Sequence, residues 1–223
     1  MTVYLGKRRV DIKHIGRAHT AGDAVIHVPD QNVMFTGDIV EDHSACYCGD
    51  GYFGDWGQTL DNIKAYDVDA IAPGRGGALI GKDAVERAIE STRNFVESTF
   101  KPAQRVAMKG GTLKEAWDAV RAECDPKFKD YAIYEHCLPF NVSRAFDEAR
   151  ALLTRGEQQL RGVHALELGK LLCKRGEVER LAGDLDAARA ARDEAASIAA
   201  ETKAGPDSEL GRAVAALNDA LNQ

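Results

Sequence analysis

A histidine and an aspartate, each in a short glycine-containing motif, are the residues of this chain most suited to chemistry. His19 lies in the motif His-Thr-Ala-Gly-Asp and Asp38 ends the motif Phe-Thr-Gly-Asp. Between them, two short β-rich runs at 24–28 and 33–35 are joined by Pro-Asp-Gln-Asn, which predicts a β-hairpin. Because a hairpin returns the chain to where it began, the imidazole and the carboxylate can converge at one end of a sheet. Such side chains bind metals, although two ligands alone do not make a metal site.

The order of motifs resembles the second half of a metallo-β-lactamase-fold hydrolase. After the hairpin come an aromatic loop with Trp56, an expected helix over 59–66, an expected strand over 68–72 and a Pro-Gly-Arg-Gly loop at 73–76. The resemblance covers about residues 3 to 100. It implies an α/β fold, the C-terminal half of an αββα sandwich. It also implies that His19 is a zinc ligand and that Asp38 is the catalytic aspartate that bridges two metals.

Two departures from the family pattern limit what the resemblance implies. The family's His-x-His-x-Asp-His cluster should lie upstream of His19, but His14 is the only other histidine there. Arg75 stands where the family's final histidine is expected, and a guanidinium that is always protonated cannot donate a lone pair to zinc. Arg75 could pair with Asp38 and replace the charge of a second metal, or it could contact an anionic substrate group beside a single metal.

The segment 39–57 is rich in glycine, aspartate and aromatic residues and is predicted to be a long loop. By the resemblance it borders the active site, so Tyr52 and Phe53 are candidates for an apolar substrate wall, whereas Trp56 is expected to pack against the sheet. Cys46 and Cys48 could hold a soft metal, but the more economical interpretation is two free thiols in a loop. Five cysteines in a chain of this length do not form a disulfide framework.

The remainder of the chain is predicted to be helical. Apolar spacing predicts an amphipathic helix over 81–100, and Thr-Leu-Lys-Glu at 112–115 is a capping box that opens a second helix. A third helix is expected to end near Leu153. The adjacent His136 and Cys137 invite a nucleophile–base interpretation, but a buried packing role is expected because neighbouring residues rarely bring their reactive atoms together.

A composition shift after Phe146, with alanine dominant and aromatic residues absent, predicts a domain boundary at 154–156. The domains are then 1–155, the metallo-β-lactamase-like half domain, and 156–223, an all-α helical tail. The tail is predicted as two helices joined at 182–184 and a third after 204–206. Its small residues resemble a tetratricopeptide repeat in their spacing, and a plain alanine-rich appendage is the alternative; the residues are Gly176, Gly183, Ala188 and Ala195. One repeat cannot bury its own face, so the tail should dock on the first domain, pair with another copy or remain loosely ordered.

Composition narrows the class of protein. The net charge of −6 argues against a nucleic-acid partner. No apolar run approaches the ~18–20 residues of a membrane span and no secretion signal is recognisable, so a cytoplasmic protein is expected. Residues 1–20 read as one or two strands that would leave an exposed sheet edge, which another chain could cover unless this reading frame is a fragment.

Three functional hypotheses follow. In the first, the chain belongs to a zinc-dependent hydrolase of ester, thioester or amide-type bonds, with Arg75, Tyr52 and Phe53 contacting a small-molecule substrate. It would be incomplete, and weak or inactive, as this chain alone. In the second, it is a non-catalytic scaffold that binds protein partners or itself through its helical tail. In the third, it is a truncated or fused form whose isolated product is inactive.

Overall fold

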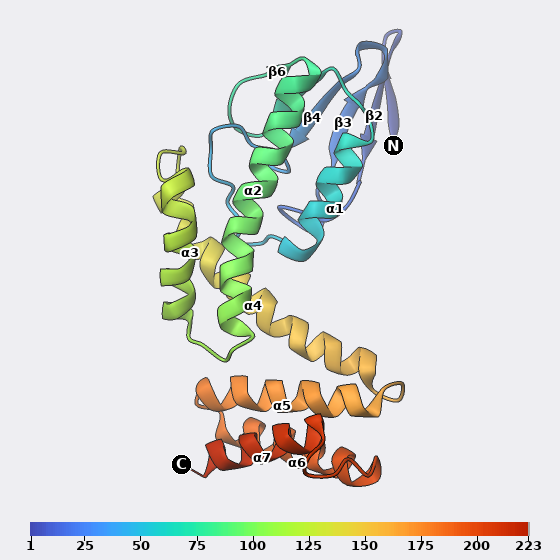
Figure 1. The fold of residues 1–223 in the computed structure, drawn as a ribbon. Helices are drawn as coiled ribbons and strands as arrows, with labels where there is room; N and C mark the ends of the chain where they lie inside the picture. The colour runs from blue at the N-terminus through green and yellow to red at the C-terminus, as the bar shows by residue number, and fades with distance from the viewer. Residues whose placement is uncertain (223) are drawn as a thin grey trace. The chain divides into compact units, whose positions relative to one another are not determined.

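A computed structural model describes residues 1–222, except the side chains of residues 153 and 154. The strands in this range are β1 (Thr2–Leu5), β2 (Arg8–Lys13), β3 (Val25–Val28), β4 (Val33–Gly37), β5 (Ala70–Pro73) and β6 (Leu79–Ile80). The α-helices are α1 (Phe53–Lys64), α2 (Lys82–Ala107), α3 (Leu113–Phe128), α4 (Tyr134–Leu160), α5 (Ala165–Leu181), α6 (Leu185–Glu201) and α7 (Glu209–Leu221) (Figure 1). The fold is α/β with a helical C-terminal region, as the sequence predicted.

The chain divides into two compact units. The first contains Met1–Lys101 and Val120–Ala145, and the second contains Pro102–Ala119 and the residues from Phe146 onward. Helices α2, α3 and α4 each contribute residues to both units. None of the helices between residues 1 and 222 has the length and apolar character needed to cross a lipid bilayer.

The first unit is built on one mixed sheet with the strand order β1-β2-β3-β4-β5-β6. The predicted hairpin is confirmed: β3 and β4 pair antiparallel, with Ile26 opposite Phe35, and a 3-10 turn at Pro29–Gln31 joins them. β4 and β5 are the parallel pair, connected through α1. The loop before β3, the loop after β4 and the loop after β5 therefore lie at the same end of the sheet.

Helices cover one face of this sheet. Val25 and Met34 are fully buried, and Ile71, paired with Met34 on the neighbouring strand, is 1% exposed. Trp56 and Leu60 of α1 are also fully buried. In Figure 1, α1 and the first part of α2 lie side by side in front of the strands. This apolar layer fixes the positions of the loops at the sheet end.

On the opposite sheet face, a row of apolar side chains remains partly exposed within the described residues of the first unit. The strand register places Ile12, Ile26, Phe35 and Ala72 in one row across four neighbouring strands. The exposed fraction is 38% for Ile26 and 47% for Phe35. In stable domains an apolar face of this kind is usually buried against another layer.

Helix α1 corrects the sequence prediction. A loop was expected to continue to residue 57 and a helix to begin at residue 59, but α1 begins at Phe53. Phe53, Trp56, Leu60 and Ile63 are buried along one side of α1. Glycines at 54 and 57 obscure this apolar stripe in the sequence because glycine has low helix propensity.

Helix α4 also differs from the prediction, because it does not end near Leu153 but continues to Leu160. Gly156, expected to mark a joint, lies within the helix. A β-carbon at that position would meet a methyl group of Leu171 at 3.2 Å. The glycine therefore permits the close approach of α4 and α5 and does not interrupt the helix.

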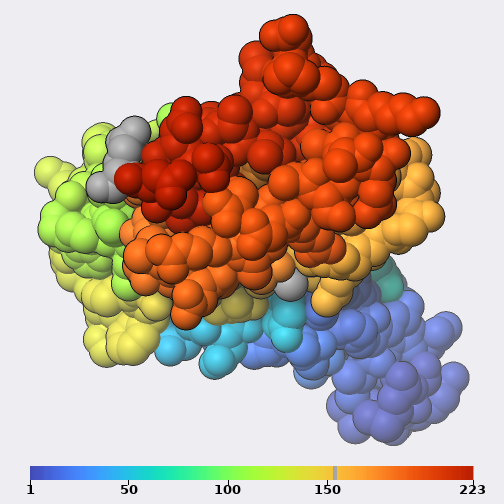
Figure 2. Space-filling model, turned by 90° about the horizontal axis from the view of Figure 1, so that it is seen from below, coloured from blue at the N-terminus to red at the C-terminus, as the bar shows by residue number. Residues whose placement is uncertain are grey.

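The three tail helices agree with the predicted pattern. Figure 2 shows the surface of their residues in orange to red. Ser208 caps α7 by accepting a hydrogen bond from the backbone N–H of Gly211 at 2.9 Å. Gly176 on α5 lies where a β-carbon would be 2.6 Å from a methyl group of Leu217 on α7, so a larger residue there would force Leu217 or the helices to shift. Ala188 and Ala195 on α6 are fully buried. Small residues thus let these helices pack closely, as expected; their identity as a tetratricopeptide repeat stays a prediction.

Candidate functional site

The loops at the end of the sheet bring His19 and Asp38 together. The Nε2 atom of His19 lies 3.6 Å from Oδ2 of Asp38. Their side chains are 19% and 34% exposed, so both remain accessible to a small ligand. The hairpin topology that predicted this convergence is the physical reason for it.

Hydrogen bonds within and around the His-Thr-Ala-Gly-Asp motif shape the loop that carries His19. The Asp23 carboxylate accepts hydrogen bonds from the backbone N–H of Thr20 at 3.0 Å and from its hydroxyl at 2.6 Å. The backbone N–H of Tyr52 donates to the carbonyl of Ala18 at 2.8 Å. Asp23 therefore serves the site by ordering the loop.

Two aromatic rings flank the imidazole of His19. Trp56 contacts it edge-on with a centroid separation of 6.3 Å, and Tyr47 lies at 6.4 Å. The indole N–H of Trp56 donates to the carbonyl of Ile39 at 3.0 Å. Trp56 thus packs in the core, as expected, and also limits the orientations of His19.

Arg75 reaches into the same site from the loop after β5. Its Nη1 atom lies 3.6 Å from Oδ2 of Asp38 and 2.5 Å from Oε1 of Glu41. Gly74 permits this approach because a β-carbon there would be 2.1 Å from Oδ1 of Asp38. The backbone N–H of Gly74 donates to the carbonyl of Gly37 at 2.9 Å, which joins the two loops. The pairing of Arg75 with Asp38 that the sequence suggested is present in the structure.

Glu41 is a member of the site that sequence reasoning missed. Its side chain is fully buried, and its Oε2 atom has no hydrogen-bond partner within the described part of the chain. Burial raises the pKa of Glu41 to about 7, although the charge of Arg75 acts in the opposite direction. One feature of the sequence could have indicated that Glu41 is buried: it directly follows the apolar pair Ile39 and Val40, and both of these are buried.

The two aromatic residues predicted to contact substrate occupy different environments. Tyr52 is half-buried, and its ring lies 4.4 Å from the guanidinium carbon of Arg17 and 5.6 Å from that of Arg144. Phe53 is 5% exposed and stacks on Phe100 at 5.3 Å. The structure therefore leaves Tyr52 partly accessible to a substrate. It places Phe53 in the core, where the ring packs against Phe100.

The Cys-x-Cys motif is part of the core. The Asn141 amide donates to the carbonyl of Cys46 at 2.8 Å, and its oxygen accepts from the backbone N–H of Cys48 at 2.6 Å. Burial raises the pKa of both thiols well above its usual range. Protonated, enclosed thiols favour the interpretation as free cysteines over that of a soft-metal site.

The adjacent His136 and Cys137 are not brought together as a reactive pair. Cys137 is 1% exposed and directs its thiol to the carbonyl of Ala45 at 3.8 Å, whereas His136 is exposed. The packing role expected for Cys137 agrees with this placement.

The residues of this chain do not by themselves fit a catalytic zinc ion. Among residues 1–222, no group of three or more histidine, cysteine, aspartate or glutamate side chains is arranged to hold a metal. A catalytic zinc usually has three protein ligands, and here His19 and Asp38 supply two. The side chain next to them is the guanidinium of Arg75, which cannot act as a ligand.

Comparison with known proteins finds metallo-β-lactamases that are similar to part of the chain. A curated relative, the type 2 metallo-β-lactamase of Bacteroides fragilis, is 29% identical over 107 residues, which make up 46% of this chain and 43% of the relative. A solved metallo-β-lactamase from Pontibacter korlensis is 20% identical with a TM-score of 0.38, covering 44% of this chain and 45% of that chain. The solved metallo-β-lactamase IND-7 is 24% identical with a TM-score of 0.38, covering 44% of each chain. No protein-family model matches the chain.

The curated sequence match confirms the resemblance that the motifs suggested: part of this chain is similar in sequence to a metallo-β-lactamase over 107 residues. The chain spans less than half the length of the relatives it matches.

Proposed function

We propose that this chain is part of a metal-dependent hydrolase of the metallo-β-lactamase superfamily and is incomplete on its own. The convergence of His19 and Asp38 at the end of the sheet carries the proposal. This convergence lies in the region whose motifs resemble the family. The bonds hydrolysed would be of the ester, thioester or amide type in a small-molecule substrate.

The incompleteness follows from the donor set. His19 and Asp38 are two donors where a catalytic zinc needs about three, and Arg75 adds none. The curated relative extends well beyond the part that matches this chain. We therefore infer that the remaining donors come from a further segment or another chain.

The apolar sheet face supports this inference. The row formed by Ile12, Ile26, Phe35 and Ala72 is available for a second layer within the first unit. A partner that covers this row would gain binding free energy of roughly 25 cal/mol for each Å² of apolar surface removed from water. The same partner could bring its own ligands to the end of the sheet.

Other residues of the site would act on the substrate. Arg75 is 39% exposed and could pair with an anionic group of the substrate while it remains held by Glu41. Tyr52 offers a partly accessible ring beside two guanidinium groups. For Phe53, substrate contact would require its ring to leave the core, so we assign it to packing against Phe100.

The Arg75→His variant tests the proposal within this chain. If the site lacks only donors, a histidine in this loop adds a third and should raise zinc affinity at least about tenfold, measured by chelator competition. His19→Ala in the same background should abolish the gain, and Arg87→His, at an exposed position of α2, serves as the control. No gain of affinity, or a gain that persists without His19, would refute the assignment.

A second candidate function is a non-catalytic scaffold, and one observation favours it. Arg75 already pairs with both Asp38 and Glu41, so a positive charge occupies the site without any Lewis acidity. In that case the helical tail would carry the function through protein contacts. Absence of zinc binding by both the native chain and Arg75→His would support this candidate over the hydrolase.

A further inference from the structure

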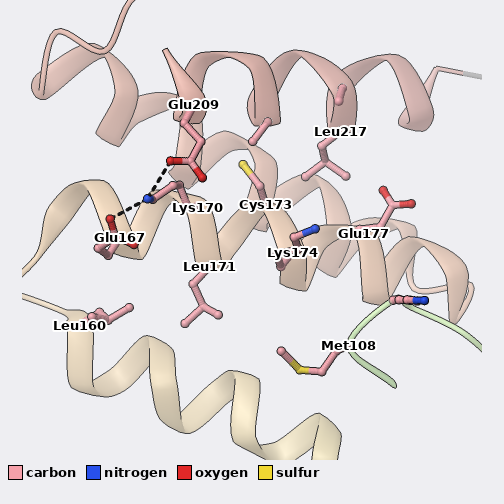
Figure 3. A pocket seen from close by; sticks show the side chains of 13 residues that line it. Met108, Leu160, Glu167, Lys170, Leu171, Cys173, Lys174, Glu177, Glu209 and Leu217 are labelled. Carbon is pink, nitrogen blue, oxygen red and sulfur yellow. Dashed lines mark hydrogen bonds and ion pairs between the residues drawn. The ribbon is translucent and has the colours of Figure 1, made fainter. Parts of the chain in front are cut away.

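A pocket of about 660 Å³ opens within the second unit, apart from the His19 site (Figure 3). It is lined by residues of α5 and α7, by the end of α4 and by the turn at Met108 and Lys109 that follows α2. All of these belong to the same compact unit. Pockets of roughly 300–1,000 Å³ are the usual size for small-molecule ligands.

The lining combines apolar and charged side chains, and the apolar ones include three leucines and a methionine. Leu160 of α4 and Leu171 of α5 line the pocket together with Leu217 of α7, which is 3% exposed. Met108 borders it and leaves 40% of its surface in water. Figure 3 shows Met108, Leu160 and Leu171 around a common space. A hydrocarbon group in this space would remove apolar surface from water on both sides, which favours binding.

The charged residues of the pocket fall into two groups. Lys170 forms ion pairs with Glu167 at 2.6 Å and with Glu209 at 3.1 Å, which Figure 3 shows at one end of the pocket. Lys174 and Lys109 are exposed lining residues, and within residues 1–222 neither has a carboxylate within 4.0 Å. The labelled Lys174 lies toward the end where Met108 is found. Two ammonium groups are thus available to a ligand beside the apolar lining.

We propose that this pocket binds a small amphiphile with a hydrocarbon body and one anionic head group, of the fatty-acid carboxylate class. The head group pairs with Lys174 and Lys109, and the hydrocarbon body lies against Met108, Leu160 and Leu171. This site is separate from the proposed hydrolase centre and needs no metal.

The acidic residues of the pocket set the charge of the ligand. Glu177 lies among the lining residues and is paired with Arg180 at 3.1 Å, while Glu167 and Glu209 share Lys170. An acidic peptide would bring several carboxylates near these three glutamates and be repelled. A single head group brings one negative charge, so it pairs with the two available lysines at a smaller cost in repulsion, which favours the fatty-acid class.

The first test is isothermal titration calorimetry of the full chain, free of metal, with dodecanoate well below its micelle-forming concentration. We expect saturable binding of one dodecanoate per chain, with dodecan-1-ol binding more weakly and dodecyltrimethylammonium weakest. The double variant Lys109→Gln/Lys174→Gln should weaken dodecanoate binding about tenfold, because each exposed ion pair contributes up to ~1 kcal/mol. Lys129→Gln, an exposed lysine of the first unit, is the matched control and should bind as the native chain does.

A steric variant locates the site. Ala216 lines the pocket and is exposed, so Ala216→Trp fills the space without disturbing the core, which circular dichroism verifies. This variant should lose most dodecanoate binding. The proposal is overturned if the native chain shows no saturable binding, if the alcohol binds as tightly and the lysine substitutions have no effect, or if the folded Ala216→Trp binds normally.

Discussion

The substitution Glu41→Gln should change how the stability of the first unit depends on pH. Burial raises the pKa of Glu41 from its ordinary value of 4.5 to about 7. The folded protein then binds the proton more tightly than the unfolded chain, so the stabilising effect is complete below pH 4.5 and is lost as the pH rises through 7. The difference between the two pKa values corresponds to at most about 3 kcal/mol, of which about 2.5 kcal/mol is lost between pH 5 and pH 8. Glutamine imitates the protonated acid and cannot titrate.

Urea denaturation near pH 5 and near pH 8 measures this effect. Trp56 is fully buried in the first unit and reports its unfolding by fluorescence in a Trp117→Phe background. Relative to Glu41→Gln, the protein with Glu41 should lose about 2.5 kcal/mol of unfolding free energy between the two pH values. Glu97→Gln, whose partly exposed carboxylate pairs with a lysine, controls for a simple change of charge. If the Glu41→Gln variant and the protein with the native glutamate show the same pH dependence, the pKa of Glu41 is not raised, and the claim that burial outweighs the charge of Arg75 fails.

Three further substitutions test the packing that the site and the tail require. Gly74→Ala should lower the unfolding free energy of the first unit by about 1–3 kcal/mol, because the added β-carbon would lie 2.1 Å from Oδ1 of Asp38. Gly77→Ala is the control and should change the unfolding free energy little in the same urea assay, because a β-carbon there has open space within 4 Å. Gly176→Val should lower the unfolding free energy of the tail by about 2 kcal/mol, because Gly176 faces Leu217 closely. Gly205→Val is the control and should not lower it, because nothing lies within 4 Å of a β-carbon at that position. Equal calorimetric transitions for the two variants would contradict the close contact between α5 and α7. Asp184→Ala removes the side-chain cap at 3.0 Å that begins α6 and should cost about 1 kcal/mol, and unchanged helicity on heating would argue against the cap.

Local signals in the sequence predicted much of the fold. The β3–β4 hairpin follows from two β-rich runs around a proline-containing turn, and the capping box at Thr112 and Glu115 forms as expected, with the backbone N–H of Glu115 donating to the Thr112 hydroxyl at 3.2 Å. The start of α1 was missed because glycines at 54 and 57 lower the apparent helix propensity, and the length of α4 was missed because Gly156, which faces Leu171, predicts a joint from the sequence alone. The role of Gly156 depends on a residue of the next helix, which helix propensity does not report.

The site was predictable only where topology or motif determined it. His19 and Asp38 could be placed together because an antiparallel hairpin joins the ends of its strands. Glu41 could not, since its importance comes from burial beneath Arg75 and not from any motif. Lys109 and Lys174 likewise could not be singled out from the sequence, because only the folding of the second unit brings them to the same pocket.

The measurement that tests the central proposal most directly is the metal content per chain, by elemental analysis of protein purified without chelator, together with its mass in solution. Because the described residues provide two donors and an arginine, we predict close to zero metal in a monomer. One equivalent of metal in a monomer, lost in His19→Ala, would contradict the proposal that this chain alone holds an incomplete site.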